Sequence, residues 1–198
     1  METMERRTYP IRMEIREDEG TGKLTGHAAV FNEIADLRFF RERISPGAFR
    51  ESIKTDDVRA LFNHDSNFVL GRNTAGTLSM KEDKQGLAVE ITPPDTQWAR
   101  DLKESIRRGD ISQMSFGFEV RKEEWDEEQE LRTLNEVKLW DVSPVTFAAY
   151  EGTDIALRNR EAIKKENYTN GNWTANVRGK RLSLLKRKHN VTGGKLNG

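Results

Sequence analysis

Hydrophobic and polar residues alternate with a period of two along much of the first 157 residues. Ile11, Met13 and Ile15 alternate with charged residues, a pattern typical of a strand with one buried face. The same reasoning predicts further strands at Lys23–Phe31, Val58–His64, Thr77–Met80, Leu87–Ile91, Met114–Val120, Leu131–Asn135 and Glu136–Asp141. Many short strands at close spacing favour a β-barrel or a β-sandwich.

Two segments carry helix signals instead. Ser45 followed by Pro46 predicts a helix start, because a serine hydroxyl can cap the first turn and proline fits the first helical position. A second helix should begin after Asp95 or Thr96 and end at Gly109, since glycine readily adopts the conformation that terminates a helix. One face of this second helix would carry Trp98, Leu102, Ser105 and Ile106.

Length and composition limit the classes of protein that fit. A chain of 198 residues forms one domain, with room for an appendage. The sequence contains no apolar run of about 18 residues and no apolar N-terminal stretch, so we expect a soluble protein that does not follow the secretory route. It contains no cysteine, which excludes disulfides, zinc–thiolate sites and a cysteine nucleophile. Serine is therefore the expected nucleophile if the chain is a hydrolase.

Charge divides the chain into two parts. Residues 158–198 contain eleven Lys and Arg against two acidic residues, a net charge of +9, whereas residues 1–157 carry a net −9. We therefore predict a domain over 1–157 and a basic, mostly disordered tail over 158–198. The tail is either a solvated terminus or an electrostatic handle for an acidic partner. Its aromatic residues are only Tyr168 and Trp173, which argues against a nucleic-acid partner.

Three residues in or beside predicted strands have the chemistry of a serine hydrolase. His64, Ser115 and Asp141 could supply a base, a nucleophile and a group that orients the base, and these roles depend on geometry and not on chain order. The other histidines fit less well, because His27 lies in an early strand and His189 in the basic tail. Each of the three residues also has a structural interpretation: an exposed strand serine, a hydrogen-bonded histidine at a strand end, and a carboxylate that caps a turn.

Strand alternation favours Ser115 over its neighbour Ser112. The predicted apolar face holds Met114, Phe116, Phe118 and Val120. Ser115 and Gly117 then share the opposite face, whereas Ser112 points with the apolar residues if the strand extends that far. We expect Gly117 to leave space beside the Ser115 hydroxyl for a substrate backbone.

In combination, several segments resemble the prohead maturation proteases of tailed bacteriophages. The resemblance covers about residues 8–152 and is carried by Phe39–Phe49, Leu61–Asp65, Leu70–Arg72, Gly86–Leu87, Gly109–Phe118 and Asp141–Phe147. That family is similar in fold to the herpesvirus maturation proteases. The resemblance implies an α+β, mainly β fold: a closed, mostly antiparallel β-barrel with helices packed outside.

The resemblance also implies a site and a biological setting. It makes Ser115 the nucleophile, His64 the base and Asp141 the third member, with Asp65 and Glu136 as rival acids. Asp65 is disfavoured because neighbouring strand residues point to opposite faces, an argument that holds unless the strand has ended before it. Arg72 is a further candidate for a substrate contact. The implied substrates are the phage scaffold protein, the major capsid protein and the protease itself, cleaved inside an assembling procapsid in the host cytoplasm, where the protease self-associates or forms a homo-oligomer.

Other functions stay open. A capsid-assembly or scaffold-binding module without catalysis could have the same strands and tail, and a nucleic-acid-associated protein would depend on the tail. Close approach of His64 to both Ser115 and Asp141 would favour the enzyme over both. We expect no cofactor and no metal. The acidic run at residues 123–130 is typical of a solvated hairpin tip.

Overall fold

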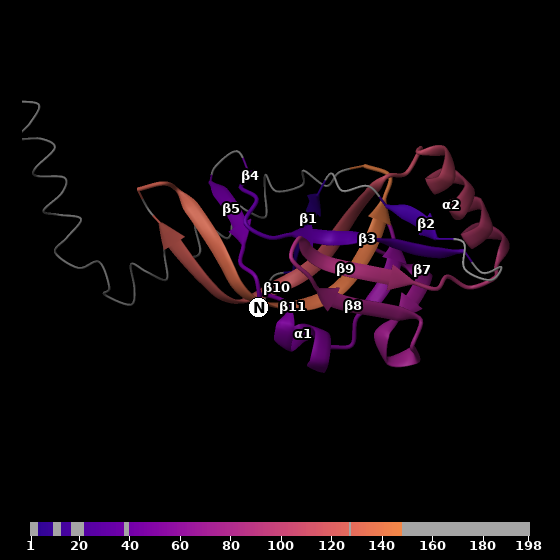
Figure 1. The fold of residues 1–198 in the computed structure, drawn as a ribbon, viewed down its shortest axis with the longest axis horizontal. Coiled ribbons are helices and arrows are strands. Elements are labelled where there is room, and N and C mark those ends of the chain that lie inside the picture. The colour runs from indigo at the N-terminus through magenta and orange to yellow at the C-terminus, as the bar shows by residue number, and fades with distance from the viewer. Residues whose placement is uncertain (1–3, 10–12, 17–21, 38–39, 127, 148–198) are drawn as a thin grey trace, which may run out of the picture. The chain divides into compact units, whose positions relative to one another are not determined.

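The computed structural model describes residues 4–9, 13–16, 22–37, 40–126 and 128–147 (Figure 1). In chain order its elements are β1 (Glu5–Tyr9), β2 (Glu14–Arg16), β3 (Lys23–Val30), β4 (Ala35–Asp36), β5 (Arg41–Ile44), α1 (Arg50–Thr55), β6 (Arg59–Phe62), β7 (Asp65–Arg72), the short 3₁₀ helix η1 (Asn73–Ala75), β8 (Leu78–Glu82), β9 (Gly86–Ile91), α2 (Gln97–Arg108), β10 (Gln113–Asp126) and β11 (Leu131–Val145). The mainly β, α+β class expected from the sequence is confirmed.

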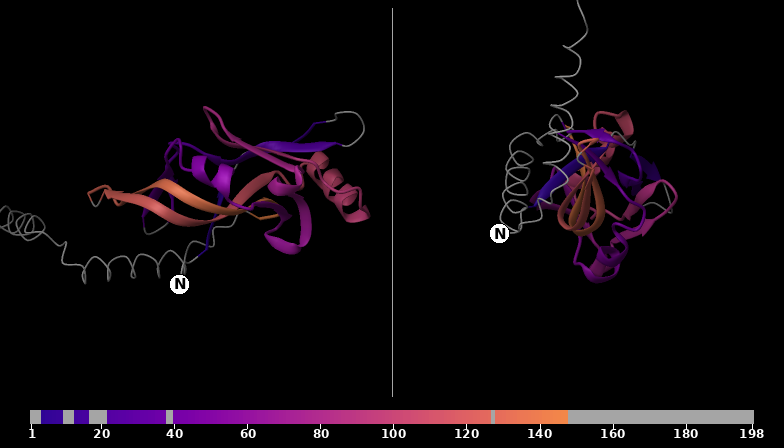
Figure 2. Two further views of the ribbon diagram at one scale, coloured as in Figure 1. Left: turned by 90° about the horizontal axis from the view of Figure 1, so that it is seen from below. Right: turned by 90° about the vertical axis from the view of Figure 1, so that its left-hand side faces the viewer.

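The strands form two sheets. One sheet has the order β1-β10-β11-β5-β4, and β6 pairs with β11 and carries β7 beside it; the other has the order β2-β3-β9-β8. Most pairs are antiparallel, but β11 pairs in parallel with β5 along one part and with β6 along another. Figure 2 shows β10 and β11 running side by side as a long hairpin.

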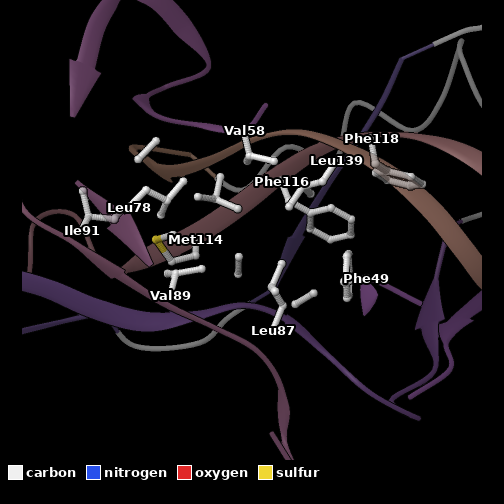
Figure 3. Close-up of a cluster of buried hydrophobic side chains, with 14 of the residues drawn as sticks. Phe49, Val58, Leu78, Leu87, Val89, Ile91, Met114, Phe116, Phe118 and Leu139 are labelled. Atoms are coloured by element: carbon white, nitrogen blue, oxygen red, sulfur yellow. The ribbon is translucent and has the colours of Figure 1, made fainter. Parts of the chain in front are cut away.

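The predicted closed barrel is wrong for the part of the chain that the structure describes. The end strands β1 and β4 of the larger sheet pair with one neighbour each, and the smaller sheet likewise ends at β2 and β8. The two sheets are stacked instead, because each has one apolar face to bury. Figure 3 shows side chains from both sheets meeting in the core, among them Met114, Phe116, Leu87 and Val89.

The helices correct one prediction and confirm the other. Helix α1 begins at Arg50 and not at Pro46, because the Ser45 hydroxyl donates a hydrogen bond to Asn135 Oδ1 on β11, 2.9 Å away, instead of capping a helix. Helix α2 follows Thr96 and ends at Gly109, as predicted. Gly109 has a φ of +84° and its N–H bonds to the last turn, a conformation that favours glycine.

No alternation of apolar and polar residues marks strand β1 in the sequence, because its inward side chains are charged. Glu5 and Arg7 are buried beside Glu42 and Arg132. Arg7 Nε lies 2.6 Å from Glu42 Oε1, and Arg132 lies 2.9 Å from Glu5 Oε2. Burial alone would raise the pKa of Glu5, but the two guanidinium groups outweigh this effect and lower it. The cluster thus ties β1 to the larger sheet through paired charges.

The structure corrects the prediction of two separate strands within residues 131–141 and does not test the predicted domain boundary. The strands expected at Leu131–Asn135 and Glu136–Asp141 are one continuous strand, β11. The domain boundary near residue 157 and the basic tail lie outside the described residues and stay predictions. Among the described helices, none combines the length and apolar character that crossing a membrane needs.

Candidate active site

Strand β10 carries Ser115 on the face opposite the core. Met114, Phe116 and Phe118 are fully buried in the core, as the alternation predicts. Ser115 points the other way but is not a solvent-facing serine, because its exposed fraction is 0%. Strand β1 on one side and β11 on the other flank it, opposite Thr8 and Ser143 respectively.

A bulge in β11 turns Asp141 toward the same face. Gly117 pairs with Asp141, whereas the next residue, Phe118, pairs with Leu139, so that Trp140 is the extra residue. Without this bulge Leu139 and Asp141 would point the same way, since they are two positions apart. Leu139 lies in the core, and Asp141 instead hydrogen-bonds to groups on the Ser115 face.

His64 lies in the tight turn between β6 and β7. Asn63 and His64 have φ values of +54° and +58°. A type I′ hairpin turn requires positive φ at both of its central residues. Such a conformation is uncommon outside glycine, and other contacts must hold it. Asn63 provides them at the end of β11: its N–H donates to the Pro144 carbonyl at 3.0 Å, and its Oδ1 accepts from the Thr146 N–H at 2.8 Å.

These three elements bring the predicted triad together. His64 Nε2 lies 2.8 Å from Ser115 Oγ, and His64 Nδ1 lies 2.6 Å from Asp141 Oδ1. The side chains of His64 and Asp141 are 5% and 7% exposed, so that little water competes for these bonds. The Ser143 hydroxyl donates to Asp141 Oδ1 at 2.6 Å. This approach of His64 to both partners is the geometry that favours an enzyme over a non-catalytic module.

Comparisons with known proteins identify the family of the chain. The family model of the caudovirus prohead serine proteases matches residues 11–167. The chain belongs to this family. The prohead protease of Enterobacteria phage HK97 is 32% identical over 148 residues, which cover 70% of this chain and 61% of that protein, so this chain spans less than two thirds of that relative. The bacteriophage T4 capsid assembly protease has a TM-score of 0.51 at 13% identity, over 72% of this chain and 96% of that chain. The T4 likeness shows a shared fold.

In this caudovirus protease family member, the two rival acids, Asp65 and Glu136, bind other partners. Asp65 Oδ1 accepts hydrogen bonds from the backbone and side chain of Asn67, both at 2.8 Å. Glu136 pairs with Lys122. The strand-alternation argument against Asp65 does not apply, because the strand ends before His64. The rival serine, Ser112, is exposed and precedes β10.

Gly117 and Arg72, the two residues predicted to contact the substrate, both lie against side chains of the protein itself. A Cβ atom at Gly117 would lie 2.4 Å from Asp141 Oδ2, so glycine here makes room for the carboxylate. Arg72 holds Asp57 with two hydrogen bonds of 2.7 and 2.5 Å. This contact is the leading reason why the pKa of Asp57 is lowered to about 2. A substrate contact at either position stays a prediction.

Two residues that position the triad were missed by sequence reasoning. Ser143 and Asn63 lie in segments that carry the family resemblance, and that was the available signal. Asn63 joins the His64 turn to Thr146, 83 residues further along the chain. Ser143 contacts Asp141, only two residues away, but that carboxylate acts through His64, 77 residues distant in the sequence. A sequence pattern does not reveal such pairs.

The remaining predicted features lie elsewhere. His27 Nε2 bonds to Asp83 Oδ2 at 2.8 Å on the smaller sheet, where both line an open hollow of about 550 Å³. Among the described residues no group of three or more His, Asp or Glu side chains is arranged to hold a metal ion. In the acidic run, Glu123 binds Arg132 at 2.6 Å and Asp126 accepts backbone hydrogen bonds in the hairpin turn.

Proposed function

We propose that the chain is a serine endopeptidase of the His–Ser–Asp type that acts in procapsid maturation. Ser115 is the nucleophile, His64 the general base and Asp141 the residue that orients His64. The observation that carries this proposal is the continuous chain of hydrogen bonds from Ser115 Oγ through the imidazole to the Asp141 carboxylate. A carboxylate at Nδ1 keeps the other ring nitrogen free to accept a proton and stabilises the imidazolium that forms.

The reaction is acyl transfer in two steps. Ser115 Oγ attacks the scissile carbonyl carbon while His64 Nε2 takes the hydroxyl proton, and the protonated ring then gives that proton to the leaving amine as the peptide bond breaks. Water, deprotonated by His64, attacks the resulting ester, and the proton returns to Ser115 as the carboxylic acid product leaves. The Ser143 hydroxyl on Asp141 Oδ1 fixes the carboxylate through both steps.

The substrates we propose are the scaffold protein, the major capsid protein and the protease itself. Support comes from the family, whose members are prohead proteases, and from the T4 relative, which is a capsid assembly protease. The site of action would be the assembling procapsid in the host cytoplasm, where copies of the protease come together. The basic segment 158–198 would recruit the enzyme to this assembly or be cleaved from it, and the similarity to herpesvirus proteases stays a prediction.

Co-expression with the capsid and scaffold proteins of the same phage tests the proposal. New termini are mapped by mass spectrometry with the wild-type chain, with Ser115→Ala and with Ser112→Ala. We expect cleavage with wild type and with Ser112→Ala, and none with Ser115→Ala. Equal loss in both variants contradicts the choice of Ser115, and unchanged cleavage with Ser115→Ala contradicts the mechanism. Loss of residues beyond about 157 from wild type, but not from Ser115→Ala, would indicate self-processing of the tail.

A further inference from the structure

The nucleophile is covered by the protein's own N-terminal strand. Ser115 has no exposed surface, yet a peptide carbonyl must reach its Oγ for any cleavage to occur. Strand β1 lies antiparallel to β10 directly beside it, with Thr8 opposite Ser115. The Arg7 carbonyl oxygen lies 2.8 Å from Ser115 Oγ and accepts its hydrogen bond. A backbone carbonyl thus already occupies the space beside the nucleophile.

This carbonyl competes with the catalytic base. Ser115 Oγ lies 2.8 Å from the Arg7 carbonyl and 2.8 Å from His64 Nε2, but a hydroxyl has a single hydrogen to donate. When the hydrogen points to Arg7, His64 cannot take it. The arrangement with β1 in place therefore opposes the proton transfer on which nucleophilic attack depends.

Strand β1 is also placed where an incoming strand could replace it. It is an end strand of its sheet and pairs with β10 alone among the described strands. Extended peptides bind proteins by adding to such a sheet edge, because main-chain hydrogen bonds give affinity and alternate side chains give specificity. We infer that β1 occupies the position of the substrate strand, and that cleavage requires a substrate peptide to replace it on β10. This inference rests on the proposed function.

The contacts of β1 indicate which peptides would fit. The residue in the place of Arg7 presents its carbonyl to Ser115, so its side chain occupies the place where Arg7 meets the fully buried Glu42. The residue two positions earlier takes the place of Glu5, which lies 2.9 Å from Arg132. The substrate class is therefore an extended peptide with a basic residue before the cleaved bond and an acidic residue two positions before that.

Hydrogen exchange on the intact wild-type protein tests the strand position. A fluorophosphonate probe forms a bond between Ser115 Oγ and phosphorus as the P–F bond breaks and the hydroxyl proton passes to His64. The bound phosphonyl group needs the space of the Arg7 carbonyl, so we expect labelling to increase amide exchange at residues 5–9 selectively. Labelling without any change in exchange at residues 5–9 would overturn the inference.

A matched pair of variants tests the same point by rate. Arg7→Ala leaves Glu42 without one of its two buried partners, and undocking of β1 relieves that penalty. We expect Arg7→Ala to be labelled roughly tenfold faster or more, whereas Arg6→Ala, which removes an exposed charge from the same strand, keeps the wild-type rate. If Arg7→Ala and Arg6→Ala are both folded and are labelled at equal rates, the inference that β1 occupies the substrate position is contradicted. If circular dichroism shows that Arg7→Ala is unfolded, the wild-type exchange result decides.

A competing peptide tests the preferred substrate. The capped hexapeptide Met-Glu-Arg-Arg-Thr-Tyr, which copies residues 4–9, should slow labelling of Arg7→Ala or be cleaved after its second arginine. Exchanging its acidic residue with that second arginine should abolish both effects, and equal effects of the two peptides overturn the preference. No labelling of any protein would contradict the activated serine, and so the proposed function together with the inference. If wild type, Arg7→Ala and Arg6→Ala are all labelled at the same rate, and amide exchange at residues 5–9 does not change, the inference is contradicted but the proposed function is not.

Discussion

Two His–Asp pairs in this molecule differ in almost everything except the pairing itself. His64 and Asp141 are buried, and the second ring nitrogen of His64 faces the Ser115 hydroxyl. The side chains of His27 and Asp83 are partly exposed on the smaller sheet, and among the described residues Asp83 is the hydrogen-bond partner of the His27 ring. A carboxylate near an imidazole is therefore a common arrangement, and the third group and the exclusion of water distinguish a catalytic pair.

The largest expected contrast comes from removing each histidine. His64→Ala should reduce cleavage of a co-expressed substrate by about 10⁶-fold, the scale seen when a serine protease loses its base. His27→Ala should leave cleavage unchanged, because its ring has no contact with the triad among the described residues. Rates from mass spectrometry of timed samples check both. Comparable loss in both variants would show that the comparison of the two pairs is wrong.

The two carboxylates should differ next. Asp141→Asn retains the shape but no longer fixes the correct tautomer of His64, so we expect kcat to fall about 10⁴-fold with the fold intact. Asp83→Asn serves as the matched control and should keep the wild-type kcat. Thermal unfolding of each variant separates a catalytic loss from a folding loss. A mild effect of Asp141→Asn would assign the third role to another group.

A smaller effect should follow from filling the space at Gly117. Gly117→Ala places a methyl group against Asp141 Oδ2, so the carboxylate must shift. Misplacement by about 1 Å can cost roughly 10²-fold in rate, and we expect a loss of this order in kcat. Glu124→Ala, at an exposed position on the same strand, is the control and should have no effect. If KM rises while kcat stays constant, Gly117 contacts the substrate instead, as the sequence analysis expected.

The partly exposed pair should contribute to stability and not to catalysis. Burial alone would raise the pKa of Asp83, but hydrogen bonds from Gly86 N–H and His27 outweigh it and lower the pKa from 3.8 to about 2. A lowered carboxyl pKa stabilises the fold above pH 3.8, and this contribution is lost as the pH falls toward 2. Asp83→Asn should lower the free energy of unfolding at pH 7 by less than about 1 kcal/mol and weaken its pH dependence between pH 4 and 2. Denaturant titrations across this range measure both, and an unchanged pH dependence would contradict the assignment.

Local patterns predicted several elements well. Residues 113–120 alternate strictly, so the sequence placed Ser115 opposite Met114 and Phe116, and the structure agrees. Helix α2 was also predictable, because its apolar spacing and the glycine after it are local signals. Strand β1 was not, since Glu5 and Arg7 are buried through ion pairs with residues distant in the sequence.

The sequence by itself determined the mainly β class, the family and the three residues of the candidate triad, because residue types and their order are local information. The tertiary structure alone decided how these residues meet. The bulge at Trp140 reverses the alternation that would send Asp141 to the core, and the left-handed turn at His64 is held by Asn63 against the end of β11. The covering of Ser115 by β1 is likewise a contact between segments more than 100 residues apart. Bulges, turns and strand order depend on long-range pairing, which a residue pattern along one strand does not contain.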